Sequence, residues 1–205
     1  MTVHPYENYD LREDDPNLIP GSECLQNNLG ITDTKTLNTL ERQITAPMLI
    51  ALQKSPVQPT YDLQHLCNIH NRLFGRVYPF AGKVRTVEIA KGGRLFLPHT
   101  LINVVSKKLF MELRKENYLL GYDKDMFCQR IGYYFASINT IHPFREGNGR
   151  TQRVLIDQLA AKNGFKINWA AISGFSIADA SAAALAGDKA GNGLARLVKN
   201  NLKVL

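Results

Sequence analysis

The chain has 205 residues, 44% of them hydrophobic, and a formal net charge of +7. This length and composition are typical of one globular domain with a substantial core. They exclude a membrane protein, because no apolar run approaches the roughly 18 residues that a membrane span requires.

The N-terminus and the cysteines favour a cytoplasmic location. The chain begins with neither a basic start nor an apolar stretch, so we expect no secretory signal peptide. The three cysteines, Cys24, Cys67 and Cys128, form no C-x-x-C pair. We expect three buried thiols in a reducing compartment, with neither a disulfide framework nor a zinc site.

The charge is divided unevenly along the chain. Residues 1–33 carry seven acids and one base, while the remainder carries 24 bases and 11 acids. A basic body attracts an anionic partner, which could be a nucleic acid, a nucleotide or an acidic protein face. Charge alone does not choose among these partners.

The first elements in chain order are an acidic segment and two helices. Residues 1–33 are rich in Asp and Pro, so we expect an extended N-terminal segment that either lacks fixed structure or docks on the basic body. Thr32 or Asp33 could cap a helix that runs through Ile44. A second helix is predicted from about Asp62, after a loop marked by prolines.

A short β-hairpin and three more helices follow. The alternation from Arg85 to Ile89 predicts one strand, residues 91–94 predict a turn, and residues 95–97 predict the returning strand. Helices are predicted at 101–116, 123–141 and 148–163, where Gly164 ends the last of them. The fold class is therefore mostly α with one small hairpin.

The segment that carries chemistry lies between the last two of these helices. It reads His142-Pro143-Phe144-Arg145-Glu146-Gly147-Asn148-Gly149-Arg150-Thr151-Gln152-Arg153. Gly147 and Gly149 can take backbone angles closed to other residues, so the turn can aim N–H groups inward as an anion nest. The N-terminus of the next helix adds its free N–H groups and its positive dipole end. Together they predict a phosphate site.

The side chains of this segment complete the prediction. Arg150 and Arg153 lie on one helical face and can both reach phosphate oxygens. Glu146 supplies a hard oxygen ligand suited to Mg²⁺, and His142 can accept a hydroxyl proton near neutral pH. A base, a metal ligand, an anion nest and two arginines indicate transfer of a phosphorus-containing group.

The segment matches H-x-F-x-[D/E]-G-N-G-R-x-x-R at every defined position and therefore resembles the signature of the Fic family. Other segments in the family's order are Asn28 to Ile31, Ile69-His70, Tyr78 to Arg85, and Lys91-Gly92 with Phe96. The resemblance implies a Fic-fold helical bundle with a β-hairpin flap over residues 34–205, with its core at 62–169. One departure is Phe80, where many relatives have Trp.

The resemblance implies a protein adenylyltransferase that moves AMP from ATP·Mg²⁺ to a Ser, Thr or Tyr hydroxyl of a target protein. His142 would be the catalytic base and Glu146 the Mg²⁺ ligand. The nucleotide would be bound by Gly147, Asn148, Gly149, Arg150 and Arg153. The flap that clamps the target by strand addition would consist of Lys91, Gly92, Gly93, Arg94, Leu95 and Phe96.

Regulation and target are further expectations from the resemblance. Many family members silence themselves with a helix bearing [S/T]-x-x-x-E-[G/N], but no Glu-Asn or Glu-Gly pair in this chain is preceded by Ser or Thr four residues earlier. We therefore expect a separate small antitoxin that carries this helix. The resemblance is to stand-alone bacterial toxins that modify the ATPase subunits of DNA gyrase and topoisomerase IV.

Three alternatives stay open at this point. The same fold could transfer UMP, phosphocholine or phosphate, although the intact Gly149 favours nucleotidyl transfer over phosphorylation. The chain could be the domain of a host-directed effector. It could also be a catalytically inactive, basic nucleic-acid-binding protein, although it shows no recognised DNA-reading motif and we expect no direct nucleic-acid contact.

Overall fold

The computed structural model describes Tyr9 and residues 15–205. The segment 1–33 was expected to be extended, and its residues 1–8 and 10–14 lie outside the described residues. Residues 15–33 form turns with one antiparallel bridge between Leu18 and Leu25.

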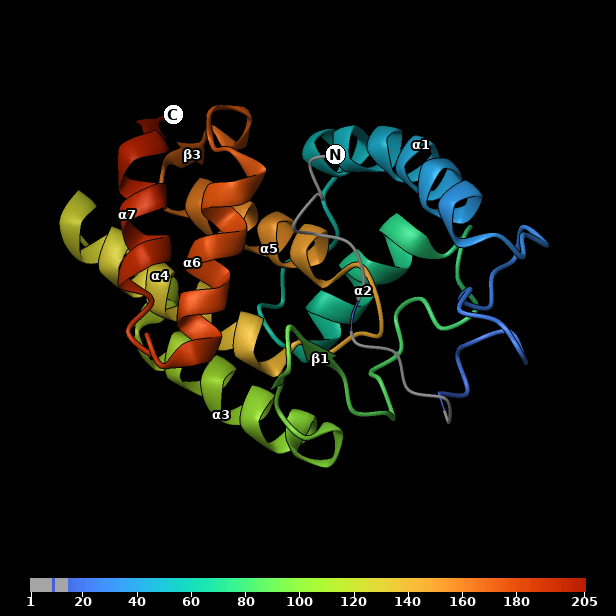
Figure 1. Ribbon diagram of the computed structural model, residues 1–205. Helices are drawn as coiled ribbons and strands as arrows, with labels where there is room; N and C mark the ends of the chain where they lie inside the picture. The colour runs from blue at the N-terminus through green and yellow to red at the C-terminus, as the bar shows by residue number, and fades with distance from the viewer. Residues whose placement is uncertain (1–8, 10–14) are drawn as a thin grey trace.

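The described chain is mostly helical, with two small sheets (Figure 1). The α-helices are α1 (Thr34–Lys54), α2 (Leu63–Phe74), α3 (Ile102–Lys115), α4 (Lys124–Ile141), α5 (Asn148–Lys162), α6 (Gly174–Ala186) and α7 (Asn192–Asn201). Short 3-10 turns lie at His99–Leu101, Asn117–Leu119 and Trp169–Ala171. The strands are β1 (Ala90–Lys91), β2 (Arg94–Leu95), β3 (Phe165–Ile167) and β4 (Leu202–Val204).

Aspartate caps fix where the helices begin. The carboxylate of Asp33 accepts the N–H of Thr36 at 2.8 Å, which starts α1 as expected. Asp62 and Asp123 start α2 and α4 in the same way. The bounds expected for α3, α4 and α5 agree with the structure to within one residue.

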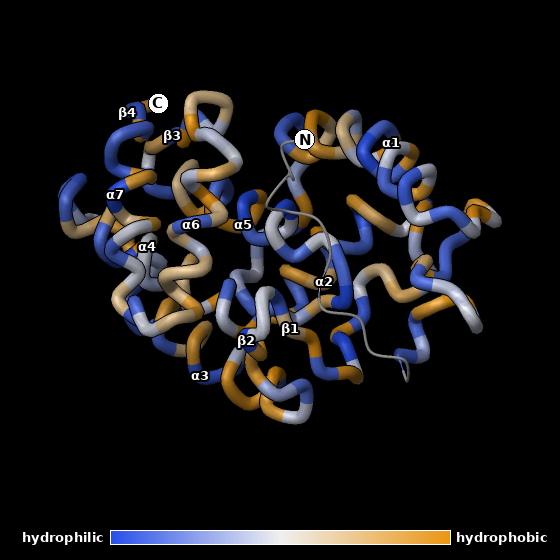
Figure 2. The backbone as a smooth tube through the Cα atoms, in the orientation of Figure 1, coloured by the Kyte–Doolittle hydropathy of each residue, from blue (hydrophilic) through white to orange (hydrophobic). Residues whose placement is uncertain are grey.

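Helix α5 passes through the middle of the molecule, between α2 on one side and α4 on the other (Figure 1). Its buried side chains Leu155, Ile156 and Leu159 are fully enclosed. The outer helices show alternating polar and apolar positions, as expected of helices with one buried face (Figure 2). The segment His142 to Arg153 therefore leads into a helix that is packed on both sides.

The hairpin is shorter than the sequence indicates. Strand β1 pairs antiparallel with β2 through Ala90↔Leu95 and Lys91↔Arg94. The predicted strand Arg85–Ile89 is wrong, because the N–H of Arg85 bonds to the carbonyl of Pro143 instead of to a partner strand. The returning strand, predicted at 95–97, is Arg94–Leu95 instead. The N–H of Leu97 bonds to the carbonyl of Thr140, so this end of the hairpin is tied to the last turn of α4.

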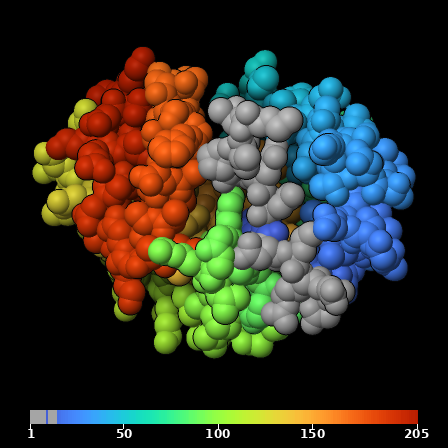
Figure 3. All heavy atoms as spheres, viewed as in Figure 1, coloured from blue at the N-terminus to red at the C-terminus, as the bar shows by residue number. Residues whose placement is uncertain are grey.

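The C-terminal part forms a cover over α4. Helix α7 crosses α4 at Gly132, where an added β-carbon would lie 2.5 Å from the β-carbon of Ala195. Strand β3 pairs antiparallel with β4, which ties the end of the chain to the end of α5. In the space-filling view the green surface around the hairpin and α3 lies between the orange-red C-terminal helices and the blue α1 (Figure 3).

None of the helices in the described part of the chain has the length and hydrophobicity that crossing a bilayer demands.

Candidate active site

The turn between α4 and α5 is built on two residues with left-handed backbone angles. His142 caps α4 with φ of 48°, and the following Pro143 disfavours continuation of the helix through this residue. Gly147 caps α5 with φ of 79°. An added β-carbon at Gly147 would lie 2.4 Å from the ring of Phe74, so only glycine fits there.

His142 is buried and held in one tautomer. Its Nδ1–H donates to the carbonyl of Asn139 at 2.8 Å, which leaves the lone pair on Nε2. Its ring stacks on Phe96 with centroids 3.8 Å apart. Burial lowers the pKa of His142 to about 3, so the imidazole is neutral at pH 7.

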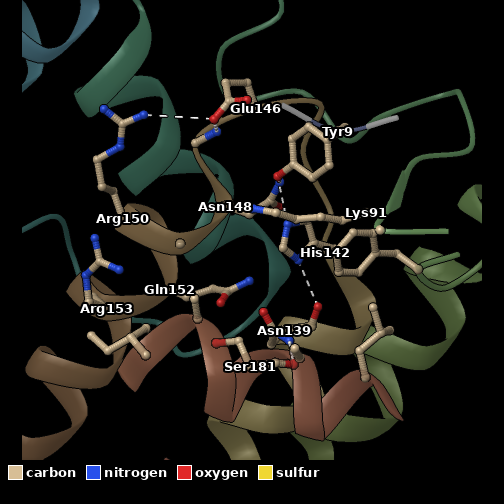
Figure 4. Close-up of a pocket in the computed structure, with 18 of the residues that line it drawn as sticks. Tyr9, Lys91, Asn139, His142, Glu146, Asn148, Arg150, Gln152, Arg153 and Ser181 are labelled. Atoms are coloured by element: carbon tan, nitrogen blue, oxygen red, sulfur yellow. Dashed lines mark hydrogen bonds and ion pairs between the residues drawn. The ribbon is translucent and has the colours of Figure 1, made fainter. Parts of the chain in front are cut away.

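The hydroxyl of Tyr9 lies against the free nitrogen of His142. The distance between Tyr9 Oη and His142 Nε2 is 2.7 Å, and the same oxygen accepts an N–H of the Asn148 amide at 3.1 Å (Figure 4). Burial, with the negative charge of Glu146, raises the pKa of Tyr9 well above its ordinary value. The phenol therefore donates its hydrogen to His142 in this structure.

Asn148 also closes the turn on itself. Its Oδ1 accepts the N–H of Phe144 at 2.9 Å, and its Nδ2 donates to the carbonyl of Phe144 at 2.7 Å. The side chain is 1% exposed. The amide expected to hold phosphates therefore also fixes the shape of the turn that would hold them.

His70 of α2 supports the turn from below. Its Nε2–H donates to the carbonyl of Glu146 at 2.8 Å, and its Nδ1 accepts the N–H of Gly82 at 2.8 Å. Its ring stacks on Phe144 with centroids 4.0 Å apart. Burial lowers its pKa to about 4, which matches a neutral imidazole that both donates and accepts.

Arg85 ties the hairpin to the turn. Its Nε donates to the carbonyl of His142 at 2.8 Å, and its terminal nitrogens donate to carbonyls of Val87 and Leu97. The side chain is fully buried. In the sequence, Arg85 ends the segment Tyr78 to Arg85, which resembles the family. Nothing in the sequence indicates that its side chain bonds to His142, 57 residues away.

The acidic and basic side chains of the site form a linked row. The carboxylate of Glu146 accepts the N–H of Gly147 at 2.8 Å and lies 3.9 Å from Arg150. Arg150 in turn donates to Glu41 of α1 at 2.5 Å and to Thr45. Burial, together with the charge of Glu41, raises the pKa of Glu146. The pairing of Arg150 with Glu41 was not foreseen from the sequence.

One cavity of about 890 Å³ brings the predicted residues together, a volume suited to a nucleotide. It is lined by His142, Glu146, Gly147, Asn148, Gly149, Arg150 and Arg153 and by Lys91, Gly92, Arg94 and Phe96 of the hairpin. Gly93 and Leu95, also predicted for the flap, are not among its lining residues, and Leu95 is 65% exposed. Lys91 is half-buried, and burial lowers its pKa.

Further lining residues come from segments to which the sequence assigned no role. Helix α6 contributes one wall of the cavity, including Phe175, which is 70% exposed, and Ser181, whose carbonyl accepts the amide of Asn139. Tyr9 contributes another wall. A tyrosine in an acidic N-terminal segment gives no local signal of such a position.

A magnesium ion fits the donors present. Within residues 9 and 15–205, no three His, Cys, Asp or Glu side chains are grouped to hold a metal ion. Mg²⁺ at nucleotide sites commonly binds through one or two carboxylates plus substrate phosphates and water. The carboxylate of Glu146, which lines the cavity beside Gly147, is a donor of this kind.

Comparison with known families and proteins agrees with this geometry. Residues 60–160 match the model of the Fic/DOC family. The chain is 33% identical over 159 residues to a probable protein adenylyltransferase Fic of Salmonella typhimurium, covering 78% of each chain. It is 39% identical over 155 residues to the protein adenylyltransferase VbhT of Bartonella schoenbuchensis, which covers 76% of this chain but 32% of that protein.

Solved structures share the fold. The BepC protein of Bartonella tribocorum, a VirB-translocated effector with bound AMPPNP, superposes with a TM-score of 0.85 at 22% identity, covering 92% of this chain and 97% of that one. The N-terminal Fic domain of a VirB-translocated Bep effector of Bartonella quintana, with bound ADP, gives a TM-score of 0.85 at 25% identity, covering 92% and 94%. The expected mostly helical Fic fold is confirmed.

The chain therefore belongs to the Fic/DOC family, and it is a protein adenylyltransferase of that family.

Proposed function

We propose that the chain transfers AMP from ATP to a Ser, Thr or Tyr hydroxyl of a target protein, with His142 as the catalytic base. The observation that carries this proposal is the 2.7 Å contact between the hydroxyl oxygen of Tyr9 and Nε2 of His142. The same oxygen contacts Asn148, the first residue of α5. A base within hydrogen-bond reach of a hydroxyl is the first geometric requirement for proton abstraction.

The phosphates would lie at the N-terminus of α5. Backbone N–H groups of Asn148 and Gly149 support this position, since the first N–H groups of a helix have no partner within it. The N–H of Gly147 donates to the carboxylate of Glu146, so Gly147 would contribute through the shape of the turn. Arg153 lines the same cavity and would contact the terminal phosphates. Arg150 would bind from its position against Glu41, which fixes the guanidinium in place.

Glu146 would hold Mg²⁺ together with phosphate oxygens. When bound, the metal ion would neutralise part of the charge on the α- and β-phosphates. In this chain the carboxylate is oriented by the N–H of Gly147, so its place relative to the phosphate site is set by the same turn.

The hairpin would bind the target segment. The two paired strands span residues 90–95, and Phe96, which follows them, stacks on the ring of His142. A peptide that added to this edge as a further strand would present its hydroxyl to His142. Exposed Leu95 and cavity-lining Arg94 would then influence which target is chosen.

We propose DNA gyrase and topoisomerase IV ATPase subunits as targets, and a separate small antitoxin as the inhibitor. The support is the absence from the sequence of the [S/T]-x-x-x-E-[G/N] pattern. A host-directed effector domain is the second candidate. It is favoured by the resemblance to the effector BepA, 28% identical with a TM-score of 0.82, covering 91% of this chain and 68% of that one.

The test uses the purified chain with ATP labelled on the α-phosphorus, Mg²⁺, and bacterial gyrase and topoisomerase IV subunits. We expect label on an acceptor subunit, lost in His142→Ala and retained in His99→Ala, a matched histidine that does not line the cavity. Label only from γ-labelled ATP would show a kinase, and label only from UTP would show UMP transfer.

Two further results would redirect the proposal. Label on proteins of a eukaryotic lysate but not on either topoisomerase would support the effector role. Salt-sensitive DNA binding with no nucleotide turnover would instead favour the nucleic-acid-binding alternative.

A further inference from the structure

Two carboxylates face the guanidinium of Arg150, and they are held in different ways. Glu41 Oε1 accepts a hydrogen bond from Arg150 Nη1 at 2.5 Å, and Glu41 Oε2 accepts one from the hydroxyl of Tyr78 at 2.9 Å. Glu146 Oε1 accepts the N–H of Gly147 and lies 3.9 Å from Arg150 Nη2 (Figure 4). Both oxygens of Glu41 are therefore engaged, whereas Glu146 Oε2 accepts no hydrogen bond from the described residues.

Further contacts hold Arg150 on the side of Glu41. Thr45 Oγ1 accepts a second hydrogen bond from Arg150 Nη1 at 3.1 Å, and the guanidinium lies over the ring of Phe74, 4.7 Å from its centroid. The side chain of Glu41 is 5% exposed and that of Arg150 is 22% exposed, so each needs the charge of the other. At 3.9 Å, Glu146 is the more distant of the two carboxylates.

Arg145, another arginine of the motif, is engaged elsewhere. Its Nε donates to the carboxylate of Asp15 at 2.5 Å, and both side chains are about 5% exposed or less. In the described part of the chain, Arg150 is the cation at ion-pair distance from Glu146. The position of Arg150 between Glu41 and Glu146 therefore determines whether a cation of the protein covers the carboxylate of Glu146.

We propose that Glu41 is a positioning residue that keeps Arg150 away from Glu146, so that the Glu146 carboxylate stays open to Mg²⁺. This inference rests on the nucleotide and metal site of the proposed function. A guanidinium and a metal ion both bind the lone pairs of a carboxylate, so they compete for it. By holding Nη1 of Arg150, Glu41 also leaves the other nitrogens of the guanidinium for phosphate oxygens.

Removal of the charge of Glu41 would shift this arrangement in one direction. Glutamine has nearly the shape of glutamate but no charge, so Arg150 would lose its closest counter-ion while still largely enclosed. Glu146 is then the carboxylate within its reach, and Arg150 would turn toward it. Mg²⁺ would have to displace this ion pair, whereas ATP without a metal ion would meet one negative charge fewer.

The experiment measures binding to the full chain by calorimetry, with α,β-methylene-ATP as an analogue that cannot transfer AMP. Binding is measured in EDTA, and again as Mg²⁺ is titrated at a fixed concentration of the analogue. In Glu41→Gln we expect the Mg²⁺ concentration for half-saturation to rise about 10-fold or more. The Kd for the metal-free analogue should stay equal or fall, which a damaged fold would not produce.

Glu112→Gln is the matched control. Glu112 bonds to an arginine and a tyrosine in the same way, with Arg130 at 2.8 Å and the Tyr133 hydroxyl at 3.0 Å, but it does not line the cavity. Both binding measurements should be unchanged in this variant.

Two more variants test the route through Arg150. Thr45→Val removes one hydrogen bond to Arg150 but keeps the charge of Glu41, so the Mg²⁺ requirement should rise by a smaller factor; this variant decides if Glu41→Gln does not fold. In a chain that already carries Arg150→Gln, adding Glu41→Gln should cause no further rise, because no guanidinium remains to turn. A crystal structure of Glu41→Gln should show a hydrogen bond between Arg150 and Glu146.

The outcomes separate this inference from the proposed function. An unchanged Mg²⁺ requirement in Glu41→Gln, or an equal loss of affinity with and without Mg²⁺, would overturn the inference. A further rise on the Arg150→Gln background would do the same. Because binding is measured without transfer, a raised Mg²⁺ requirement in a chain that labels no acceptor would support the inference and overturn the proposed AMP transfer. Label that depends on His142, without the shift in Mg²⁺ requirement, would overturn the inference alone.

Discussion

At the scale of single residues, the two glycines of the motif meet different constraints. Gly147 has a left-handed backbone, and an added β-carbon would be 2.4 Å from the Phe74 ring. Gly149 is helical, and an added β-carbon would meet only the end of the Arg153 side chain at 3.5 Å. The fold therefore requires glycine at position 147. At position 149 the fold would accept a side chain, so we expect the constraint there to come from the bound nucleotide.

Gly147→Ala should destabilise the fold. The positive φ costs about 1–2 kcal/mol and the overlap with Phe74 about 1–3 kcal/mol more. Chemical denaturation measures the change in the free energy of unfolding. Gly121→Ala is the control, because Gly121 has φ of 85° but open space around it, so only the smaller backbone cost applies. Equal losses in the two variants would show that Phe74 moves away without cost.

Gly149→Ala should separate stability from activity. Alanine favours the helix by about 0.5–1 kcal/mol, so the free energy of unfolding should stay equal or rise. The new methyl group faces the cavity, where the phosphates are proposed to approach the backbone, so AMP transfer should fall at least ~10-fold, or ~1.4 kcal/mol. Unchanged transfer kinetics would place the phosphates elsewhere.

At the scale of elements, the sequence predicts what local chemistry determines. The Asp33, Asp62 and Asp123 caps lie beside the helices they define, so the starts of those helices were predicted accurately. The end of α1 was not, because the helix continues past Ile44 to Lys54. The strand expected at 85–89 failed because the hydrogen bonds of Arg85 go to residues of the α4–α5 turn. No local pattern reveals such partners.

The crossing of α7 over α4 depends on a small residue at position 132. Gly132→Ala should destabilise the fold by about 1–3 kcal/mol, since the new methyl group would overlap the backbone of Ala195 and outweigh the better helix propensity of alanine. Thermal unfolding tests this against Gln129→Ala, an exposed position of α4, where the expected change is within about 0.5 kcal/mol. A stabilised Gly132→Ala chain would refute the close crossing.

At the scale of the whole molecule, the site is assembled from segments that are distant in sequence. The motif predicted His142, Glu146 and the nucleotide-binding turn from one continuous stretch, and these residues do line one cavity. Tyr9, Glu41 and the wall of α6 join them only through folding. The sequence therefore predicted the cavity-lining residues that lie in the motif, but not the residues that other segments add to the cavity.

Buried histidines should make the stability of the whole molecule fall below neutral pH. The pKa of His70 is about 4 and that of His142 about 3 in the folded chain, against an ordinary 6.5. Below pH 6.5 the unfolded chain binds protons on these imidazoles that the folded chain does not. The stabilisation is therefore complete above pH 6.5 and declines as the pH falls toward the folded values.

His70→Asn isolates one of these contributions. Denaturant unfolding measures the free energy of unfolding at about pH 7.5 and at about pH 5. Between these pH values the His70→Asn chain should lose about 2 kcal/mol less stability than the unaltered chain. Leu66→Ala, a buried apolar change in the same helix, should lower stability equally at both values. An unaltered pH difference in His70→Asn would show that His70 titrates normally in the folded chain.

The buried Asp15–Arg145 ion pair has a consequence for proteolytic processing. Cleavage beyond residue 15 would remove Tyr9 and also leave the charge of Arg145 buried without its partner, which would weaken the turn that bears the site. Cleavage between Tyr9 and Asp15 would release the tyrosine and keep the ion pair. A protease acting on those few peptide bonds would leave the space beside His142 Nε2, where the Tyr9 hydroxyl lies, open to other molecules.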